Sequence, residues 1–155
     1  MRRDGKLSRV LHILLHMAEH KGPVTSEVLA KMQHTNPVVV RQIMAGLRNQ
    51  GYVQSVKGHS GGWTLVCDLS RITLSDIYTA LGSPSILAIG NRTEAPGCLV
   101  EQTVNTALGQ VFSEVEELLL SRLGSVTLDM LSKDLHARLV ARGASHNHQQ
   151  SSHAC

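Results

Sequence analysis

The sequence predicts a mainly α-helical chain with one small β-hairpin: a winged helix-turn-helix followed by a long C-terminal dimerisation helix. Three observations predict this fold class. Apolar residues recur at helical spacing through most of the 155-residue chain. Two short β-rich runs with glycines between them occur once, between residues 52 and 67. Aromatic residues make up only 3% of the chain, so aliphatic side chains and methionine must build the core, which favours helices.

The first predicted helix spans residues 6–20. Its apolar residues recur three and four positions apart, and Gly22-Pro23 ends it. The positions expected to face the core are Leu7, Val10, Leu11, Leu14, Met17 and Ala18.

A short second helix is expected over residues 27–33, with Thr25 or Ser26 as its N-cap. Its inward positions are Val28, Leu29 and Met32. Residues 34–36 then form a turn. Helix, turn and helix in this order are typical of a helix-turn-helix pair.

The third helix begins after Asn36, a favourable N-cap, and has Pro37 in its first position. It runs to about Gln50, and Gly51 ends it as a C-cap. Its inward positions are Val39, Val40, Ile43 and Leu47.

After Gly51, the sequence pattern changes from one typical of helices to one typical of β-strands. The runs 52–56 and 63–67 are short and β-rich, and the glycine-rich segment 58–62 between them supplies turn residues. We therefore expect a β-hairpin, the wing of a winged helix-turn-helix, with Trp63 packing it against the helices.

Beyond the wing, a helix of about two turns is expected from Thr73 to Leu81, ending at Gly82. A loop over residues 83–97 follows, and then the longest helical pattern of the chain, residues 98–122. A last helix is expected over residues 128–142 and a disordered tail after it.

An apolar seam runs along the helix at 98–122, with steps of four and three residues as in a coiled coil. We expect it to be a homodimer interface, because no other long helix remains in the chain to cover it. The seam residues are Val104, Leu108, Val111, Val115 and Leu118.

Charge divides the chain into two unlike parts. Residues 1–62 carry nine Lys/Arg against three Asp/Glu, whereas residues 63–155 carry six against nine. A basic part joined to an acidic part favours contact of the first with a polyanion such as double-stranded DNA. The expected DNA-binding residues lie at the N-terminus, in the third helix and in the wing: Arg2, Arg3, Lys6, Thr35, Asn36, Val38, Arg41, Gln42, Arg48, Lys57 and His59.

Within that set, Arg41 and Gln42 have the side chains that read guanine and adenine in the major groove. Arg48 is placed for a phosphate contact, and Lys57 and His59 at the wing tip for the phosphate backbone or the minor groove.

No apolar run reaches the roughly 20 residues of a membrane span, and the N-terminus does not resemble a secretory signal. The three cysteines are odd in number and far apart, which favours a reducing compartment. We therefore expect a soluble cytoplasmic protein without a membrane partner.

Three histidines, His12, His16 and His20, follow one another at intervals of four in the first helix. This spacing can bring imidazoles together for zinc or nickel. A helical wheel places them with Arg9 opposite the apolar face, so we expect an exposed stripe and assign no metal site.

The order of these motifs resembles that of the IscR/NsrR/CymR group of bacterial winged-helix regulators, the Rrf2 family. Residues 49–65, NQGYVQSVKGHSGGWTL, are similar to the wing pattern G-L-V-x-S-x-K/R-G-x-x-G-G-Y/W-x-L. Residues 72–77 resemble I-T-L-x-D-I/V, residues 125–128 resemble S-V/I-x-L, and residues 7–18 match the family's first helix. The resemblance covers about residues 5–140.

The resemblance implies a homodimeric transcription factor, often a repressor, that senses redox state, nitric oxide, iron–sulfur supply or a metabolite. Iron–sulfur members bring three cysteines and a histidine together before the long helix. Here Cys98 alone matches, Glu101 stands at the histidine position, and residues 86–97 contain no cysteine. We therefore expect no iron–sulfur cofactor.

Cys98 is the candidate sensor residue, because the first turn of a helix stabilises a thiolate that oxidants and electrophiles attack. A small-molecule sensor and a purely structural cysteine remain open alternatives. We expect Cys67 to be packed, and a ligand pocket near residues 86–89 would serve the small-molecule alternative.

No catalytic triad order, phosphate-binding loop or paired carboxylates stand out, so we expect no enzyme. The expected function is a transcriptional repressor that binds a pseudo-palindromic operator as a homodimer. Constitutive repression and a protein-interaction adapter built on a winged helix are the rival functions. The expected division is a DNA-binding domain (1–82), a sensor loop (83–97), the dimerisation and last helices (98–142) and a disordered tail (143–155).

Overall fold

The computed structural model describes residues 5–84, 91, 95 and 97–145. Six helices and one two-stranded antiparallel sheet occur in this part of the chain, and the mainly helical class with one hairpin is confirmed. The elements are α1 (Lys6–Glu19), α2 (Ser26–Met32), α3 (Pro37–Asn49), β1 (Val53–Val56), β2 (Gly62–Leu65), α4 (Leu74–Ala80), α5 (Leu99–Gly124) and α6 (Leu128–Ser145).

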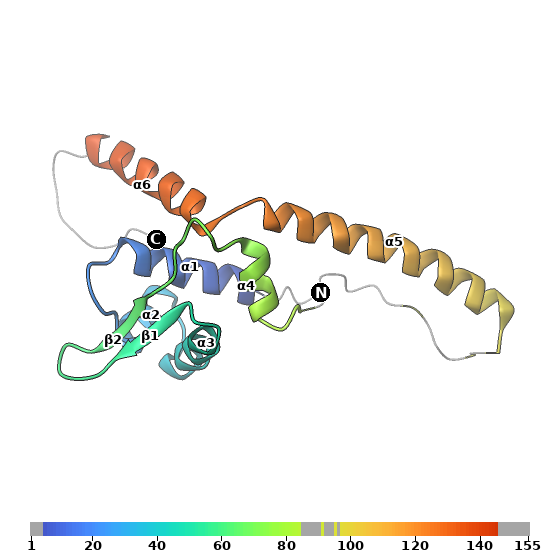
Figure 1. The fold of residues 1–155 in the computed structure, drawn as a ribbon, viewed down its shortest axis with the longest axis horizontal. Coiled ribbons are helices and arrows are strands. Elements are labelled where there is room, and N and C mark those ends of the chain that lie inside the picture. Colours follow the sequence, from blue (N-terminus) through green and yellow to red (C-terminus); the bar gives the residue numbers. More distant parts are fainter. Residues whose placement is uncertain (1–4, 85–90, 92–94, 96, 146–155) are drawn as a thin grey trace.

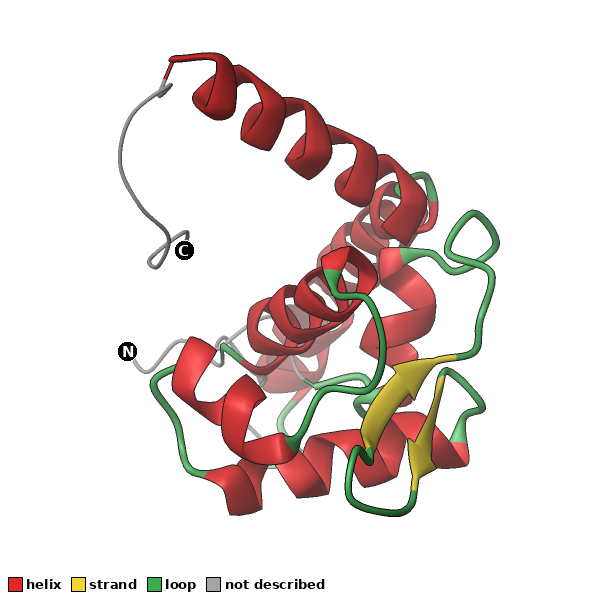
Figure 2. Cartoon of the chain, turned by 90° about the vertical axis from the view of Figure 1, so that its left-hand side faces the viewer, coloured by secondary structure: helices red, strands yellow, loops and turns green. Residues whose placement is uncertain are grey.

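The core lies among α1, α2, α3 and the hairpin, with contributions from α4 and the first residue of α6 (Figures 1 and 2). The buried side chains of α1 lie on one face of the helix, as its apolar spacing predicts. The core residues are Val10, Ile13, Leu14, Met17, Val24, Leu29, Ala30, Val40, Met44, Leu47, Val53, Ile77 and Leu128.

The hairpin pairs Val53 with Leu65 and Val56 with Gly62. Both strands are shorter than predicted: β1 begins one residue later, and β2 spans 62–65 instead of 63–67. Beyond the paired residues, Val66 N donates to the carbonyl of Tyr52 (3.1 Å), which adds one cross-strand bond at the open end of the hairpin.

At two adjacent positions in the wing, Gly61 and Gly62, other backbone segments come so close that no side chain fits. A Cβ on Gly61 would lie 2.3 Å from the carbonyl oxygen of Val56, and one on Gly62 would lie 2.7 Å from the backbone of Val24. β2 therefore docks on the segment before α2, where the N–H and carbonyl groups of Val24 and Trp63 exchange hydrogen bonds of 3.0 and 2.8 Å.

The helix after the wing begins with a capping box: Asp76 N donates to Thr73 Oγ1 (3.2 Å) and Thr73 N to Asp76 Oδ2 (2.7 Å). The same segment pairs with the start of α6, since Leu74 N donates to Val126 O and Leu128 N to Ile72 O, both at 2.9 Å. The two motifs at 72–77 and 125–128 thus meet.

α5 extends away from the rest of the molecule (Figure 1), and none of its residues is buried. α6 turns back and packs along α1. It reaches Ser145, three residues beyond the predicted helix end at about Arg142. A glycine within a helix costs only about 1 kcal/mol, so Gly143 does not stop it. Residues 146–155 lie outside the described residues.

Candidate nucleic-acid interface

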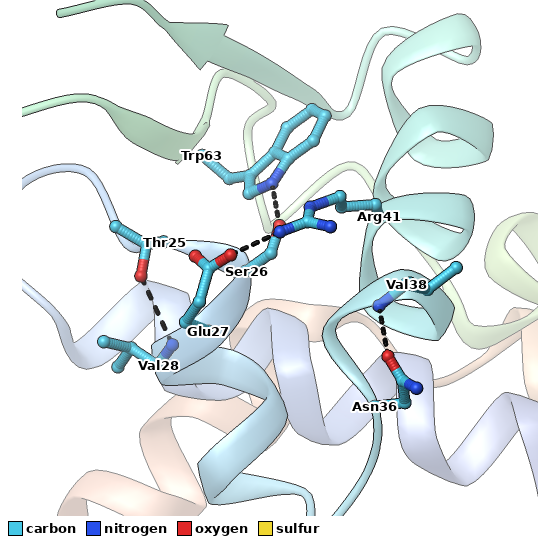
Figure 3. A network of polar contacts seen from close by, with 8 residues as sticks. All are labelled: Thr25, Ser26, Glu27, Val28, Asn36, Val38, Arg41 and Trp63. Atoms are coloured by element: carbon cyan, nitrogen blue, oxygen red, sulfur yellow. Dashed lines mark hydrogen bonds and ion pairs between the residues drawn. The ribbon is translucent and has the colours of Figure 1, made fainter.

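The start of α3 is fixed by local hydrogen bonds that the sequence predicted. Asn36 Oδ1 accepts from Val38 N at 2.8 Å, and Pro37 occupies the first turn (Figure 3). Thr25 Oγ1 accepts from Val28 N at 3.3 Å and caps α2 in the same way. The turn between the helices places His34 at φ 48°, in the left-handed region.

The predicted base-reading residues on α3 are accessible. Val38 is 51% exposed, and Arg41 and Gln42 lie one turn further along on the exposed surface. Arg48, the predicted phosphate contact, is exposed in the last turn. Thr35 is half-buried, and the side-chain oxygen of Asn36 is already used as a cap.

Arg41 is held by a residue that the sequence reasoning missed. Its guanidinium donates to the Glu27 carboxylate on α2, and both side chains are more than half exposed (Figure 3). The Glu27 carboxylate accepts hydrogen bonds from the Glu27 backbone N–H and from the Arg41 guanidinium, and these hydrogen bonds lower the pKa of the Glu27 carboxyl. No local pattern predicts a pair fourteen residues apart on two helices.

The wing presents Lys57 and His59, both exposed, in a turn where Gly58 has φ 112°. Trp63 packs against the core as predicted, and its Nε1 donates to Ser26 Oγ at 2.9 Å (Figure 3). This bond ties the wing to the first residue of α2. The wing and the helix-turn-helix are therefore joined by side-chain and main-chain contacts.

At the N-terminus, Lys6 is exposed in the first turn of α1, while Arg2 and Arg3 lie outside the described residues. A cavity of about 300 Å³ lies beside Lys6, between α1, α3 and the end of α4. Its lining is Lys6, Arg9, Val39, Gln42, Ile43, Gly46, Leu47, Ala80 and Leu81. The predicted pocket near residues 86–89 lies outside the described residues.

The cysteines differ in environment. Cys98 is exposed and is the N-cap of α5, and its backbone N–H donates to Ala95 O at 2.8 Å. The Glu101 carboxylate accepts from Ala95 N at 3.1 and 3.2 Å. Cys67 is half-buried, and burial raises the pKa of its thiol. Cys155 lies outside the described residues.

The predicted seam of α5 is open to solvent in the single chain. All five of its residues are between 37% and 59% exposed: Val104, Leu108, Val111, Val115 and Leu118. Nothing in the described part of the chain packs over them.

The predicted exposed histidine stripe is wrong for two of its three members. His12 and His16 are half-buried and their Nε2 atoms lie 3.0 Å apart, while His20 is exposed. A helical wheel of α1 places these residues opposite the apolar face, but it does not show that the His12 and His16 side chains approach each other.

No helix in the described residues is long and apolar enough to cross a membrane.

Comparison with known proteins places the chain among bacterial regulators. The profile of the family described as "Rrf2: Iron-dependent Transcriptional regulator" matches residues 4–134. YwnA, a candidate HTH-type transcriptional regulator of Bacillus subtilis, is 28% identical over 125 residues, which are 81% of this chain and 92% of that protein.

Solved structures of other proteins share this fold. A candidate transcriptional regulator from Lactobacillus plantarum superposes with a TM-score of 0.72 at 25% identity, covering 92% of this chain and 99% of the other. T. potens IscR superposes with a TM-score of 0.65 at 24% identity over 97% of this chain and 94% of the other.

Proposed function

The chain belongs to the Rrf2 family of transcriptional regulators, and on that premise we propose that it represses transcription as a homodimer on a pseudo-palindromic DNA operator. Family membership confirms the expectation of a regulator rather than an enzyme. The observation that carries the DNA-binding proposal is the capped α3, which presents Val38, Arg41 and Gln42 to solvent. Helix-turn-helix proteins read bases with the N-terminal part of this helix.

In the docked complex, α3 enters the major groove and Arg41 leaves Glu27 for a base edge. Breaking the Arg41–Glu27 ion pair costs little free energy, because an exposed ion pair is weak. Lys57 and His59 of the wing contact phosphates or the minor groove beside the helix. Arg48 and Lys6 add phosphate contacts.

The dimer forms through the apolar seam of α5. Five aliphatic side chains at alternating steps of four and three are left exposed by the chain's own fold. Pairing the α5 helices of two chains buries these side chains and holds the two α3 helices at a fixed separation. A two-fold symmetric DNA-binding dimer requires a pseudo-palindromic site.

The family description names iron, and the described residues do not fit an iron–sulfur cluster. No group of three or more His, Cys, Asp or Glu side chains converges among them. The Glu101 carboxylate, at the position of the expected histidine, is turned to the N–H of Ala95. No step of the proposed mechanism passes through iron.

Regulation is assigned to the exposed thiol of Cys98. An adduct formed there by an oxidant or electrophile sits at the start of the dimerisation helix and changes its angle to the DNA-reading module. Cys67 is the matched control, because burial raises the pKa of its thiol and lowers its thiolate fraction.

A small-molecule effector is the second candidate, and the cavity beside α3 favours it. Its lining includes Gln42, one of the predicted base readers, so a bound ligand would touch the DNA-reading helix directly. Under this alternative the Cys98→Ser variant responds to oxidants as the wild type does, and ligands that fill the cavity change operator affinity.

The test starts with duplexes selected from a random library by the full-length protein. We expect affinity to fall with salt by roughly 0.9 log units per log unit for each phosphate neutralised. Diamide or peroxide should abolish binding of wild type and of Cys67→Ser but not of Cys98→Ser. A chain that selects no duplex and binds only proteins would be an adapter instead.

A further inference from the structure

Two histidines one turn apart on α1 have converging side chains. The Nε2 atoms of His12 and His16 lie 3.0 Å apart. Their ring centroids are 4.7 Å apart, with the ring planes tilted by 31°. Because the centroids are further apart than the nitrogens, the two Nε2 atoms point toward each other.

This arrangement matches two neighbouring positions in the coordination sphere of a metal ion. An imidazole nitrogen binds zinc and similar ions at about 2.0–2.1 Å, and nitrogens 3.0 Å apart then subtend an angle of roughly 91–97° at the ion. That is the angle between neighbouring ligands in square-planar or octahedral geometry. Tetrahedral geometry, which structural Zn²⁺ sites use, would need the nitrogens about 3.3–3.4 Å apart.

We propose that His12 and His16 form a two-histidine binding site for a late first-row divalent metal ion, Cu²⁺ before Ni²⁺. Square-planar and tetragonal nitrogen sites suit these two ions, and copper has the higher affinity of the two. The described residues contain no group of three or more converging His, Cys, Asp or Glu ligands. Among the described residues, the site therefore has two protein ligands.

Metal binding requires both rings in the neutral form, with the lone pair of each Nε2 directed at the ion. Both rings are half-buried rather than enclosed, so an ion reaches them from solvent.

The site is separate from the proposed DNA contacts and does not depend on them. An ion shared by His12 and His16 joins two successive turns of α1. The other face of this helix carries Val10, Ile13 and Leu14 of the core. Since the unfolded chain does not hold the two rings together, binding stabilises the folded state and raises the temperature of unfolding.

The test is a titration of the metal-free, full-length protein with CuCl₂ and with NiCl₂. Bound ions per chain are counted by equilibrium dialysis, and thermal unfolding is followed at each concentration. His12→Gln and His16→Gln should each lose one bound copper per chain and the copper-induced rise in the unfolding temperature. His20→Gln, which changes an exposed histidine at the C-cap of α1, should keep both.

Two measurements on the wild type make the result independent of how the variants fold. Electron paramagnetic resonance of the copper complex should show hyperfine splitting from two nitrogens. Copper should also protect His12 and His16, but not His20 or His59, from diethyl pyrocarbonate, as mapped by peptide mass spectrometry. Unchanged copper counts in the His12 and His16 variants, or equal modification with and without copper, would overturn the site.

Discussion

In the proposed complex, Arg41 is the side chain expected to contribute most to base reading. We expect Arg41→Ala to cost ~1–3 kcal/mol of binding free energy on a selected duplex and to flatten the preference among base substitutions. Lys57→Ala should weaken all duplexes about equally, because phosphates carry no sequence information. Competition binding with mutated duplexes distinguishes the two effects. Unchanged affinity in both variants would place the interface elsewhere.

In the proposed complex, Glu27 and DNA compete for the guanidinium of Arg41. Glu27→Gln removes the charged acceptor of the guanidinium, so we expect tighter binding to the selected duplex. Part of the gain comes from the lost negative charge, and Glu19→Gln, with the same charge change, measures that part. The remaining gain should vanish when Glu27→Gln is combined with Arg41→Ala. A gain that persists in the double variant would show that Glu27 acts without Arg41.

His16 makes stability dependent on pH. Burial and His12 lower its pKa in the folded state below the ordinary 6.5, so the unfolded chain binds more protons than the folded chain as pH falls below that value. The free energy of unfolding therefore decreases from neutral pH into this range. Urea unfolding at several pH values should show a smaller decrease in His16→Gln. Parallel curves for the two proteins would contradict the assignment.

At the scale of elements, the wing depends on the close approach of β2 to the segment before α2. A Cβ at position 62 would meet the Val24 backbone at 2.7 Å, so we expect Gly62→Ala to destabilise the protein by a few kcal/mol and to loosen the wing. Gly46→Ala is the matched control, because its Cβ meets nothing within 4 Å. That change within α3 should stabilise the chain by up to about 1 kcal/mol. Equal effects on denaturant unfolding would refute this account of the wing.

Elements governed by local rules were predictable from the sequence. The Asn36 cap with Pro37 after it and the helix start at Thr73 each follow from a few neighbouring residues, and the structure has them within one residue. The hairpin followed from its glycines, but its strand ends did not, because the point at which cross-strand pairing stops depends on the folded hairpin.

Contacts between elements were not predictable. The Arg41–Glu27 pair joins helices whose relative placement no local pattern encodes. The His12–His16 pair was misjudged for a similar reason. A helical wheel gives the positions of residues around α1 but not the orientation of their side chains in the folded chain.

At the scale of the whole molecule, the exposed seam of α5 predicts the oligomeric state. Val111→Glu combined with Val115→Glu places charges in the seam, so sedimentation velocity should show monomers and operator affinity should fall. Thr106→Glu combined with Ser113→Glu adds the same charge to the opposite side of α5 and should leave the dimer intact. Dimers of unchanged stability in the seam variant would exclude this interface.

The number of chains bound to one selected duplex tests the central claim most directly. Two α3 helices held by a paired α5 should place two chains on one pseudo-palindromic site, and scrambling one half-site should sharply weaken binding of both chains. Sedimentation of the complex at saturating protein measures this number. We predict two chains per duplex for the wild type. One chain bound with full affinity, unaffected by loss of a half-site, would contradict a homodimeric operator-binding regulator.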